Sequence, residues 1–163
     1  MEDVLMRGNT LKTCLWPSMD TAATLLLCFL ALQGTACAGI DTAINEANRV
    51  ILSSRVWNPS VEQTRNAITA IQLFLEKPNA TNDWSQAQIK EISHHTKEYR
   101  VQFRGVIHDG RKLVHCNFFP TSIKFPYWKQ EEVSVSDGGY WFWQIDYDPK
   151  THECVNLVVN GDG

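Results

Sequence analysis

The sequence lacks any hydrophobic run long enough to cross a membrane. Its longest one, Ala22–Leu32, spans 11 residues, whereas a membrane-spanning helix needs about 20. Eleven residues is the length of the hydrophobic core of a signal peptide, and Ala36-Cys37-Ala38 follows as a cleavage site of the A-x-A type. We therefore predict that residues 1–38 are a signal peptide and that residues 39–163 form one domain, secreted or periplasmic, without a membrane span.

Two other interpretations of this leader stay open. The apolar run is also compatible with a buried core helix, although no amphipathic pattern surrounds it. Cys37 would be a lipidated N-terminus if cleavage preceded it, but Gly34 stands where a lipoprotein signal has a large aliphatic residue. The stretch before the run contains three acidic residues, and a start at Met6 would remove two of them.

Cysteine is scarce in the predicted domain. Of the five cysteines in the chain, three lie in the leader, which leaves Cys116 and Cys154. Two cysteines in an exported domain predict one disulfide. The bond requires a strand order that brings the two Cα atoms within about 7 Å of each other. A two-cysteine metal site is the alternative, but the chain has no C-x-x-C pair and no histidine at ligand spacing from both.

An excess of positive charge is missing too. The leader holds two of the 15 basic and three of the 18 acidic residues, which leaves a nearly balanced domain. Nothing in it resembles the basic footprint of a nucleic-acid-binding protein. Catalytic signatures are equally scarce, because the chain contains no G-x-S-x-G, H-E-x-x-H or P-loop motif. We therefore expect no nucleic-acid partner, no cofactor and no metal.

Helices are predicted in the first half of the domain. Residues 41–57 carry apolar side chains at helical spacing, and Asn58-Pro59 would end that helix. Ser60-x-x-Gln63 is a capping box, which predicts the start of a second helix. Its apolar stripe is formed by Val61, Ala67, Ile68, Ile71, Phe74 and Leu75. Residues 84–93 predict a short third helix, capped by Asp83.

A hairpin is predicted over residues 99–119. Asp109-Gly110 is a favoured two-residue turn, and it fixes the register of the two strands. In that register one face is apolar and consists of Tyr99, Val101, Phe103, Ile107, Val114, Cys116 and Phe118. The opposite face is polar and consists of Arg100, Gln102, Arg104, His108, Arg111 and His115. A slip of one residue would exchange the two faces.

The end of the chain predicts a second hairpin. Its strands cover residues 140–147 and 153–160, on either side of a turn at Asp148-Pro149. Alternation along the first strand puts Trp141, Trp143, Ile145 and Tyr147 on one face. The long connection over residues 120–139 contains an aromatic group, Phe125 to Trp128, and predicts a short strand over residues 132–136.

Helices followed by antiparallel strands predict an α+β fold. We expect N-terminal helices packed on a curled antiparallel sheet of four to five strands. Over residues 60–160 this order of elements resembles the cystatin-like and nuclear-transport-factor-two-like folds, at the level of architecture. Cystatin inhibitors carry a Q-x-V-x-G loop and a Pro-Trp hairpin. Gln102-Phe103-Arg104-Gly105 departs from the first and Pro126-Tyr127-Trp128 only approximates the second, so protease inhibition is not implied.

Two groups of residues are candidates for recognition. They are Phe125, Tyr127 and Trp128 on the connection, and Arg100, Arg104 and His115 on the polar face of the first hairpin. Aromatic side chains on a loop supply contact area at low entropic cost, although they can equally plug an open end of the sheet. The basic group forms either an anion-binding patch or an ordinary solvated face.

The expected function follows from the lack of a recognisable catalytic group in the sequence. Asp146 and Glu153 flank the last turn and offer the chain a carboxylate pair, but near an exposed turn such pairs are rarely catalytic. We therefore expect an exported non-enzymatic binding protein, such as an inhibitor, an immunity-type protein or an accessory factor. Its partner would be another protein or a small ligand. The alternative is a small enzyme or ligand carrier with a pocket between helix and sheet.

Overall fold

The computed structural model describes residues 44, 46–77 and 83–161. The chain divides into two units, Met1–Cys37 and Ala38–Gly163, and every described residue belongs to the second. The predicted signal peptide and its cleavage site lie outside the described residues. Neither of the two described α-helices is long and apolar enough to cross a membrane.

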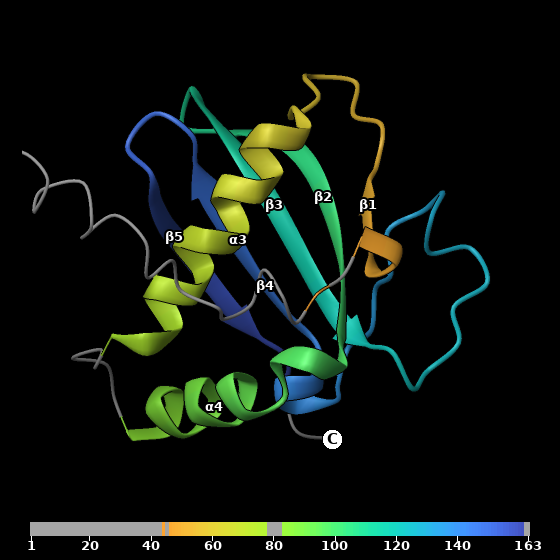
Figure 1. Ribbon diagram of the computed structural model, residues 1–163, viewed down its shortest axis with the longest axis vertical. Helices are drawn as coiled ribbons and strands as arrows, with labels where there is room; N and C mark the ends of the chain where they lie inside the picture. The colour runs from red at the N-terminus through yellow and green to blue at the C-terminus, as the bar shows by residue number, and fades with distance from the viewer. Residues whose placement is uncertain (1–43, 45, 78–82, 162–163) are drawn as a thin grey trace, which may run out of the picture. The chain divides into compact units, whose positions relative to one another are not determined.

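The described residues form an α+β fold, as predicted, with two α-helices and a five-stranded sheet (Figure 1). The helices are α3 (Val61–Glu76) and α4 (Asp83–His94), and short 3₁₀ turns are η1 (Glu46–Asn48), η2 (Thr96–Glu98) and η3 (Gly139–Trp141). The strands are β1 (Arg49–Ile51), β2 (Tyr99–His108), β3 (Arg111–Pro120), β4 (Trp143–Asp148) and β5 (Glu153–Val159). They lie in chain order across the sheet. The sheet is mixed and not wholly antiparallel, because β1 pairs with β2 in parallel.

The helix predicted over residues 41–57 is wrong for the described part of that segment. Glu46–Asn48 make a single 3₁₀ turn, and Arg49–Ile51 form β1 instead. Val50 and Ile51 are β-branched and therefore fit a pleated surface. Pairing with β2 also satisfies backbone groups that would otherwise lie on an open sheet edge. This partner is about 50 residues away in the chain, so local periodicity carried no sign of it.

The capping box predicted for α3 is confirmed. The Ser60 hydroxyl accepts a hydrogen bond from the Gln63 backbone N–H at 3.1 Å, and the Gln63 side chain accepts one from the Ser60 N–H at 2.8 Å. The apolar stripe predicted for α3 is buried at Ala67, Ile68, Ile71 and Leu75. Val61 and Phe74 differ, because Val61 is exposed and Phe74 is only half-buried.

Replacing the cap tests how much this local signal contributes to the fold. We expect Ser60→Ala to lower the free energy of unfolding by about 1 kcal/mol, because the Gln63 backbone N–H at the start of α3 loses the Ser60 hydroxyl as its acceptor. Chemical denaturation measures the change. Ser53→Ala is the matched control, since Ser53 is exposed and its side chain makes no hydrogen bond with any described residue. Equal stability of the two variants would contradict the role of the cap.

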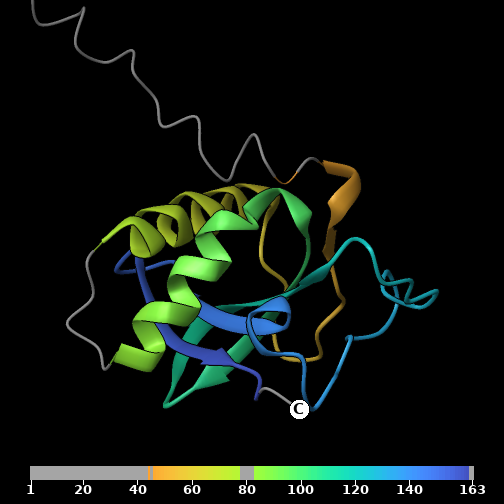
Figure 2. The same cartoon turned by 90° about the horizontal axis from the view of Figure 1, so that it is seen from below.

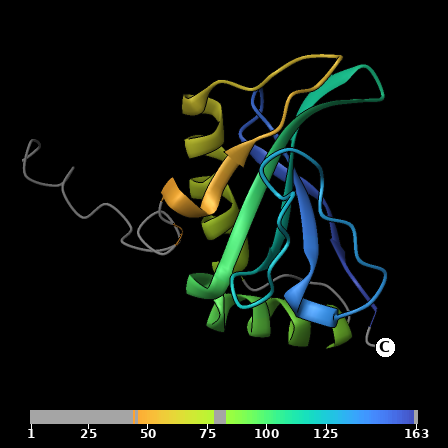
Figure 3. The same ribbon diagram turned by 90° about the vertical axis from the view of Figure 1, so that its right-hand side faces the viewer.

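The register predicted for the first hairpin is confirmed. Val101 faces Phe118 and Phe103 faces Cys116, with the turn at Asp109 and Gly110 in positive φ. The apolar face of this hairpin, here called the inner face, is buried under α3 and α4 (Figure 3). Ile107 is the exception on that face, because it is exposed near the turn.

The opposite face of the sheet, here called the outer face, is not simply solvated. Phe119, Val133 and Phe142 form a second apolar cluster there. Val133 belongs to the 121–138 connection, which projects from the body of the domain (Figure 2). The strand predicted over residues 132–136 is absent, so this connection crosses the outer face without a ladder of its own.

Candidate functional site

Two buried side-chain amides hold the irregular connection on the outer face. Gln102 and Asn117 face each other across β2 and β3 and are 1% and 3% exposed. The Gln102 amide nitrogen donates to the carbonyls of Trp128 and Glu131. Its oxygen accepts from the Val133 N–H at 2.9 Å and from the Asn117 amide at 3.0 Å. The connection is therefore fixed through a buried polar network rather than through a strand ladder.

The aromatic residues of the connection divide into partly buried and exposed members. The rings of Phe125 and Trp128 pack edge-on against Phe119, with centroid distances of 5.6 and 6.0 Å. These two side chains fill space over the outer face. Tyr127 is 40% exposed and Ile123 is 43% exposed. The tip of the connection thus presents apolar surface that the domain does not cover.

Three cations surround this exposed surface. The Arg100 guanidinium lies 5.4 Å from the centre of the Trp128 ring and donates to the Ile123 carbonyl at 3.1 Å. The Lys129 ammonium also lies 5.4 Å from the Trp128 ring. Lys124 is exposed next to Ile123. The loop-tip patch is defined here as Arg100, Ile123, Lys124, Tyr127 and Lys129.

A second cluster joins His115 to two carboxylates. The register places His115 of β3 between Arg104 of β2 and Asp146 of β4. His115 Nδ1 lies 2.8 Å from Asp146, and its Nε2 lies 3.4 Å from Glu132. Glu132 also pairs with Arg104 at 3.0 Å, and Asn156 donates to Asp146 at 3.0 Å. Arg104, His115, Glu132 and Asp146 therefore form a continuous ion-pair network.

The carboxylates keep His115 protonated. Burial of the ring lowers the pKa of His115, but the hydrogen bonds with Asp146 and Glu132 outweigh burial and raise that pKa to about 9. Burial raises the pKa of Asp146, and the hydrogen bonds from His115 and Asn156 lower it overall. With both ring nitrogens facing carboxylates, His115 has no free site for accepting a substrate proton at neutral pH. This arrangement fits a structural role better than general base catalysis.

A β-bulge supplies the Asn156 contact. Gln144 pairs with Val158 and Asp146 pairs with Val155, so β5 has one more residue than β4 in this interval. Asn156 lies in that interval with a φ of 55°. A bulge re-aims a side chain, which in this protein brings an amide onto Asp146.

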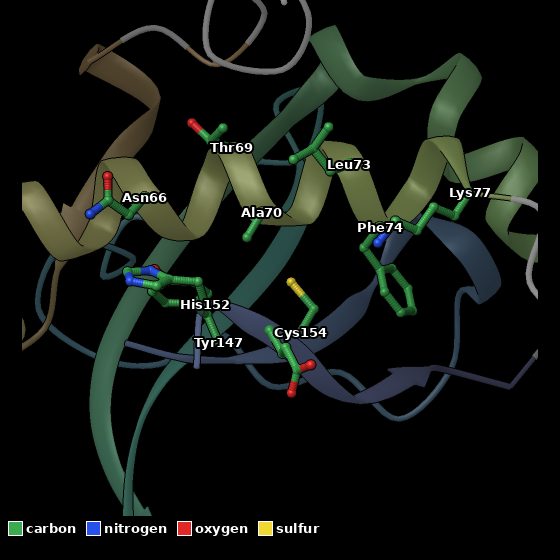
Figure 4. Close-up of a pocket in the computed structure, with 10 residues that line it drawn as sticks. Asn66, Thr69, Ala70, Leu73, Phe74, Lys77, Tyr147, His152 and Cys154 are labelled. Atoms are coloured by element: carbon green, nitrogen blue, oxygen red, sulfur yellow. The ribbon is translucent and has the colours of Figure 1, made fainter. Parts of the chain in front are cut away.

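A groove lies on the inner face, where α3 passes over the start of β5 (Figure 4). Its volume is about 530 Å³. Its walls include Ala70 and Phe74 of α3, Lys77 directly after that helix, and Tyr147, His152 and Cys154 from the sheet side. The Tyr147 hydroxyl and His152 Nδ1 are 2.7 Å apart and form one end of the groove.

The predicted disulfide is absent. Cys116 and Cys154 are both free thiols. The strands follow chain order, so β4 lies between the two cysteines, with Ile145 beside Cys116 and Tyr147 beside Cys154. Two strand spacings amount to about 10 Å, which exceeds the separation that a disulfide allows. Burial raises the pKa of both thiols, that of Cys154 to about 12, so neither is an activated nucleophile.

The six recognition residues predicted from sequence separate into two places. Arg100 joins the aromatic connection, whereas Arg104 and His115 belong to the ion-pair network. The network sets two carboxylates against two cations, so it has little net charge with which to attract an anion. Glu132 was not predicted as the partner of Arg104 and His115, because no local pattern marks it. Asp146 contacts His115 and Asn156.

No metal site is visible within the described ranges, where no three His, Cys, Asp or Glu side chains converge as ligands. Comparison with known proteins offers no further guide to the chemistry. No protein-family model, no curated protein and no solved structure matches the chain.

Proposed function

We propose that this chain is an exported binding protein without catalytic activity, and that it recognises an acidic surface on another protein through the loop-tip patch. The observation that supports this most is the anchoring of the connection by Gln102. Its amide is completely engaged by backbone groups of the connection and by Asn117. A long irregular segment is thereby held in one conformation while its tip remains uncovered.

The rigidity of the connection favours binding, because a loop that becomes ordered only in the complex loses conformational entropy on binding. A loop that is already held in place avoids most of that cost. The exposed side chains of Ile123 and Tyr127 supply apolar contact area, and aromatic anchors of this kind dominate many protein interfaces. The surrounding Arg100, Lys124 and Lys129 would steer an acidic partner toward them.

The remaining groups support a binding role over a catalytic one. His115 is enclosed by Asp146 and Glu132, and the pKa values of the Cys116 and Cys154 thiols are raised by burial. The His115 imidazole and the Cys116 and Cys154 thiols are therefore either paired or protonated, although such groups commonly perform acid–base or nucleophilic chemistry.

Cross-linked pull-down from the exported fraction of the source organism tests the proposal. We expect a partner to be captured by the wild-type chain but lost, by about tenfold or more in affinity, with the double variant Ile123→Asp/Tyr127→Ala. Val56→Asp is the matched control, because Val56 is an exposed apolar residue at 58% that lies outside the loop-tip patch. A partner that the double variant still captures at full affinity would contradict the proposal.

Salt dependence provides a second measurement on the purified partner. The association rate should fall as ionic strength rises from about 0.01 to 0.1 M, since the Debye length then drops from about 30 to 10 Å. Lys124→Gln/Lys129→Gln should flatten that dependence. An association rate that does not change with salt would contradict the proposal that the partner's surface is acidic.

A further inference from the structure

The groove on the inner face exists because two small residues oppose each other. Figure 4 shows Ala70 of α3 and the Cys154 thiol of β5 pointing toward the same space. Larger side chains at these two positions would close the gap between helix and strand. Phe74 and Cys154 are therefore only partly buried, and Leu73 beside them is 45% exposed. The apolar core is open to solvent at this point.

The size and walls of the groove match those of small-molecule sites. Its volume of about 530 Å³ lies within the range of about 300–1,000 Å³ that such sites occupy. Ala70, Phe74 and Cys154 make an apolar middle section. Lys77 lies at one end of the groove and the Tyr147–His152 pair at the other (Figure 4). A few placed polar groups around an apolar surface are what orients a ligand.

The charge at the Lys77 end is positive. Lys77 makes no ion pair with any described residue, and its ammonium opposes the rise that burial produces in the pKa of Cys154. Glu153 also borders the groove. However, it precedes Cys154 in β5, and side chains alternate along a strand, so its carboxylate points to the outer face.

The Tyr147–His152 end is held by backbone conformation as well as by a hydrogen bond. His152 adopts a φ of 62° in the turn between β4 and β5, a conformation that non-glycine residues rarely take. Its ring is thereby placed beside the Tyr147 hydroxyl, with Nδ1 and the hydroxyl oxygen 2.7 Å apart. This end therefore offers hydrogen-bonding groups, and it has no fixed negative charge that would offset the positive charge of Lys77.

From these features we infer that the groove binds a small organic anion with an apolar body. The acidic group of the ligand pairs with Lys77, and its apolar body lies between α3 and β5 against Ala70, Phe74 and Cys154. This site is separate from the loop-tip patch, which belongs to the connection on the other face of the sheet. Its occupancy therefore stands or fails independently of protein binding at that patch.

A pair of dyes separates the two parts of the inference. The anion 8-anilinonaphthalene-1-sulfonate and the neutral N-phenyl-1-naphthylamine share one ring system, and only the first carries a sulfonate. Fluorescence titration of the full-length protein measures both affinities. We expect the anionic dye to bind several-fold more tightly than the neutral one. Equal affinity for the two dyes, or no binding of either, would overturn the inference.

Two variants locate the site. Ala70→Leu fills the middle of the groove and should weaken both dyes by about tenfold or more. Lys77→Gln should weaken only the anionic dye, by about three- to fivefold, because the lost ion pair is partly exposed to solvent. The controls are Ala87→Leu and Lys90→Gln on the exposed face of α4. Wild-type affinities in Ala70→Leu or in Lys77→Gln would overturn the assigned position or the assigned charge.

Amide chemical shifts provide a measurement that does not depend on a variant folding. Adding the anionic dye to ¹⁵N-labelled wild-type protein should shift the amides around Ala70, Phe74 and Cys154. Amides of the loop-tip patch should stay unchanged. Shifts confined to other parts of the chain would show that the dye binds elsewhere and would overturn the inference.

Discussion

Replacing Gln102 with leucine should lower the free energy of unfolding by about 3 kcal/mol. Leucine is similar in size but forms no hydrogen bonds, so it leaves the Trp128 and Glu131 carbonyls and the Val133 N–H without their partner. A buried polar group that loses its partner costs about 1–3 kcal/mol. The total loss of stability is smaller than the sum of these separate costs, because the released connection can move its backbone groups into water. Chemical denaturation measures the loss of stability.

The same variant should release the connection before the domain unfolds. Amide hydrogen exchange in residues 121–135 should become faster, whereas exchange in β2, β3 and α3 should follow only the change in global stability. Gln130→Leu is the matched control, because Gln130 is exposed on the same connection. If exchange in residues 121–135 stays at the wild-type rate, Gln102 is not what holds the loop-tip patch in place.

A released connection should also bind its partner more weakly, although Gln102 lies outside the patch.

Replacing His115 with glutamine should make stability less dependent on pH. The pKa of His115 rises from 6.5 to about 9 on folding. The folded state therefore binds this proton more tightly, and the resulting stability is complete below pH 6.5 and is lost as pH rises through 9. The contribution amounts to roughly 2–3 kcal/mol, reduced from the full shift because His115 is partly exposed. His115→Gln should thus be less stable than wild type near pH 6 and nearly equal to it above pH 9.

The two carboxylates set the lower limit of this pH range. The pKa values of Glu132 and Asp146 are lowered in the folded state, so their contribution is present above their unfolded pKa values and is lost as pH falls. Denaturation curves between pH 4 and 10 measure both slopes. His94→Gln serves as the control, because His94 is an exposed histidine at the end of α4 that has no part in the ion-pair network. A difference between wild type and His115→Gln that stays constant from pH 6 to 10 would contradict the linkage.

Local signals in the sequence determined the elements whose partners are close in the chain. Asp109-Gly110 fixed the register of β2 and β3, because a two-residue turn allows only one pairing of the strands that it joins. Ser60 and Gln63 marked the start of α3, because both cap contacts lie within three residues. In these cases the physical cause acts over a few residues, so the local sequence is enough to reveal it.

Contacts between distant segments were decided only by the tertiary structure. β1 became a strand because β2 was available as its neighbour, and the strand order kept Cys116 and Cys154 apart. His115 acquired Glu132, and Gln102 acquired the carbonyls of Trp128 and Glu131, because an irregular connection crosses the outer face. Such a segment has no periodicity from which its path can be inferred. Its position depends on which buried amides and aromatic rings it meets, and only the folded chain specifies those.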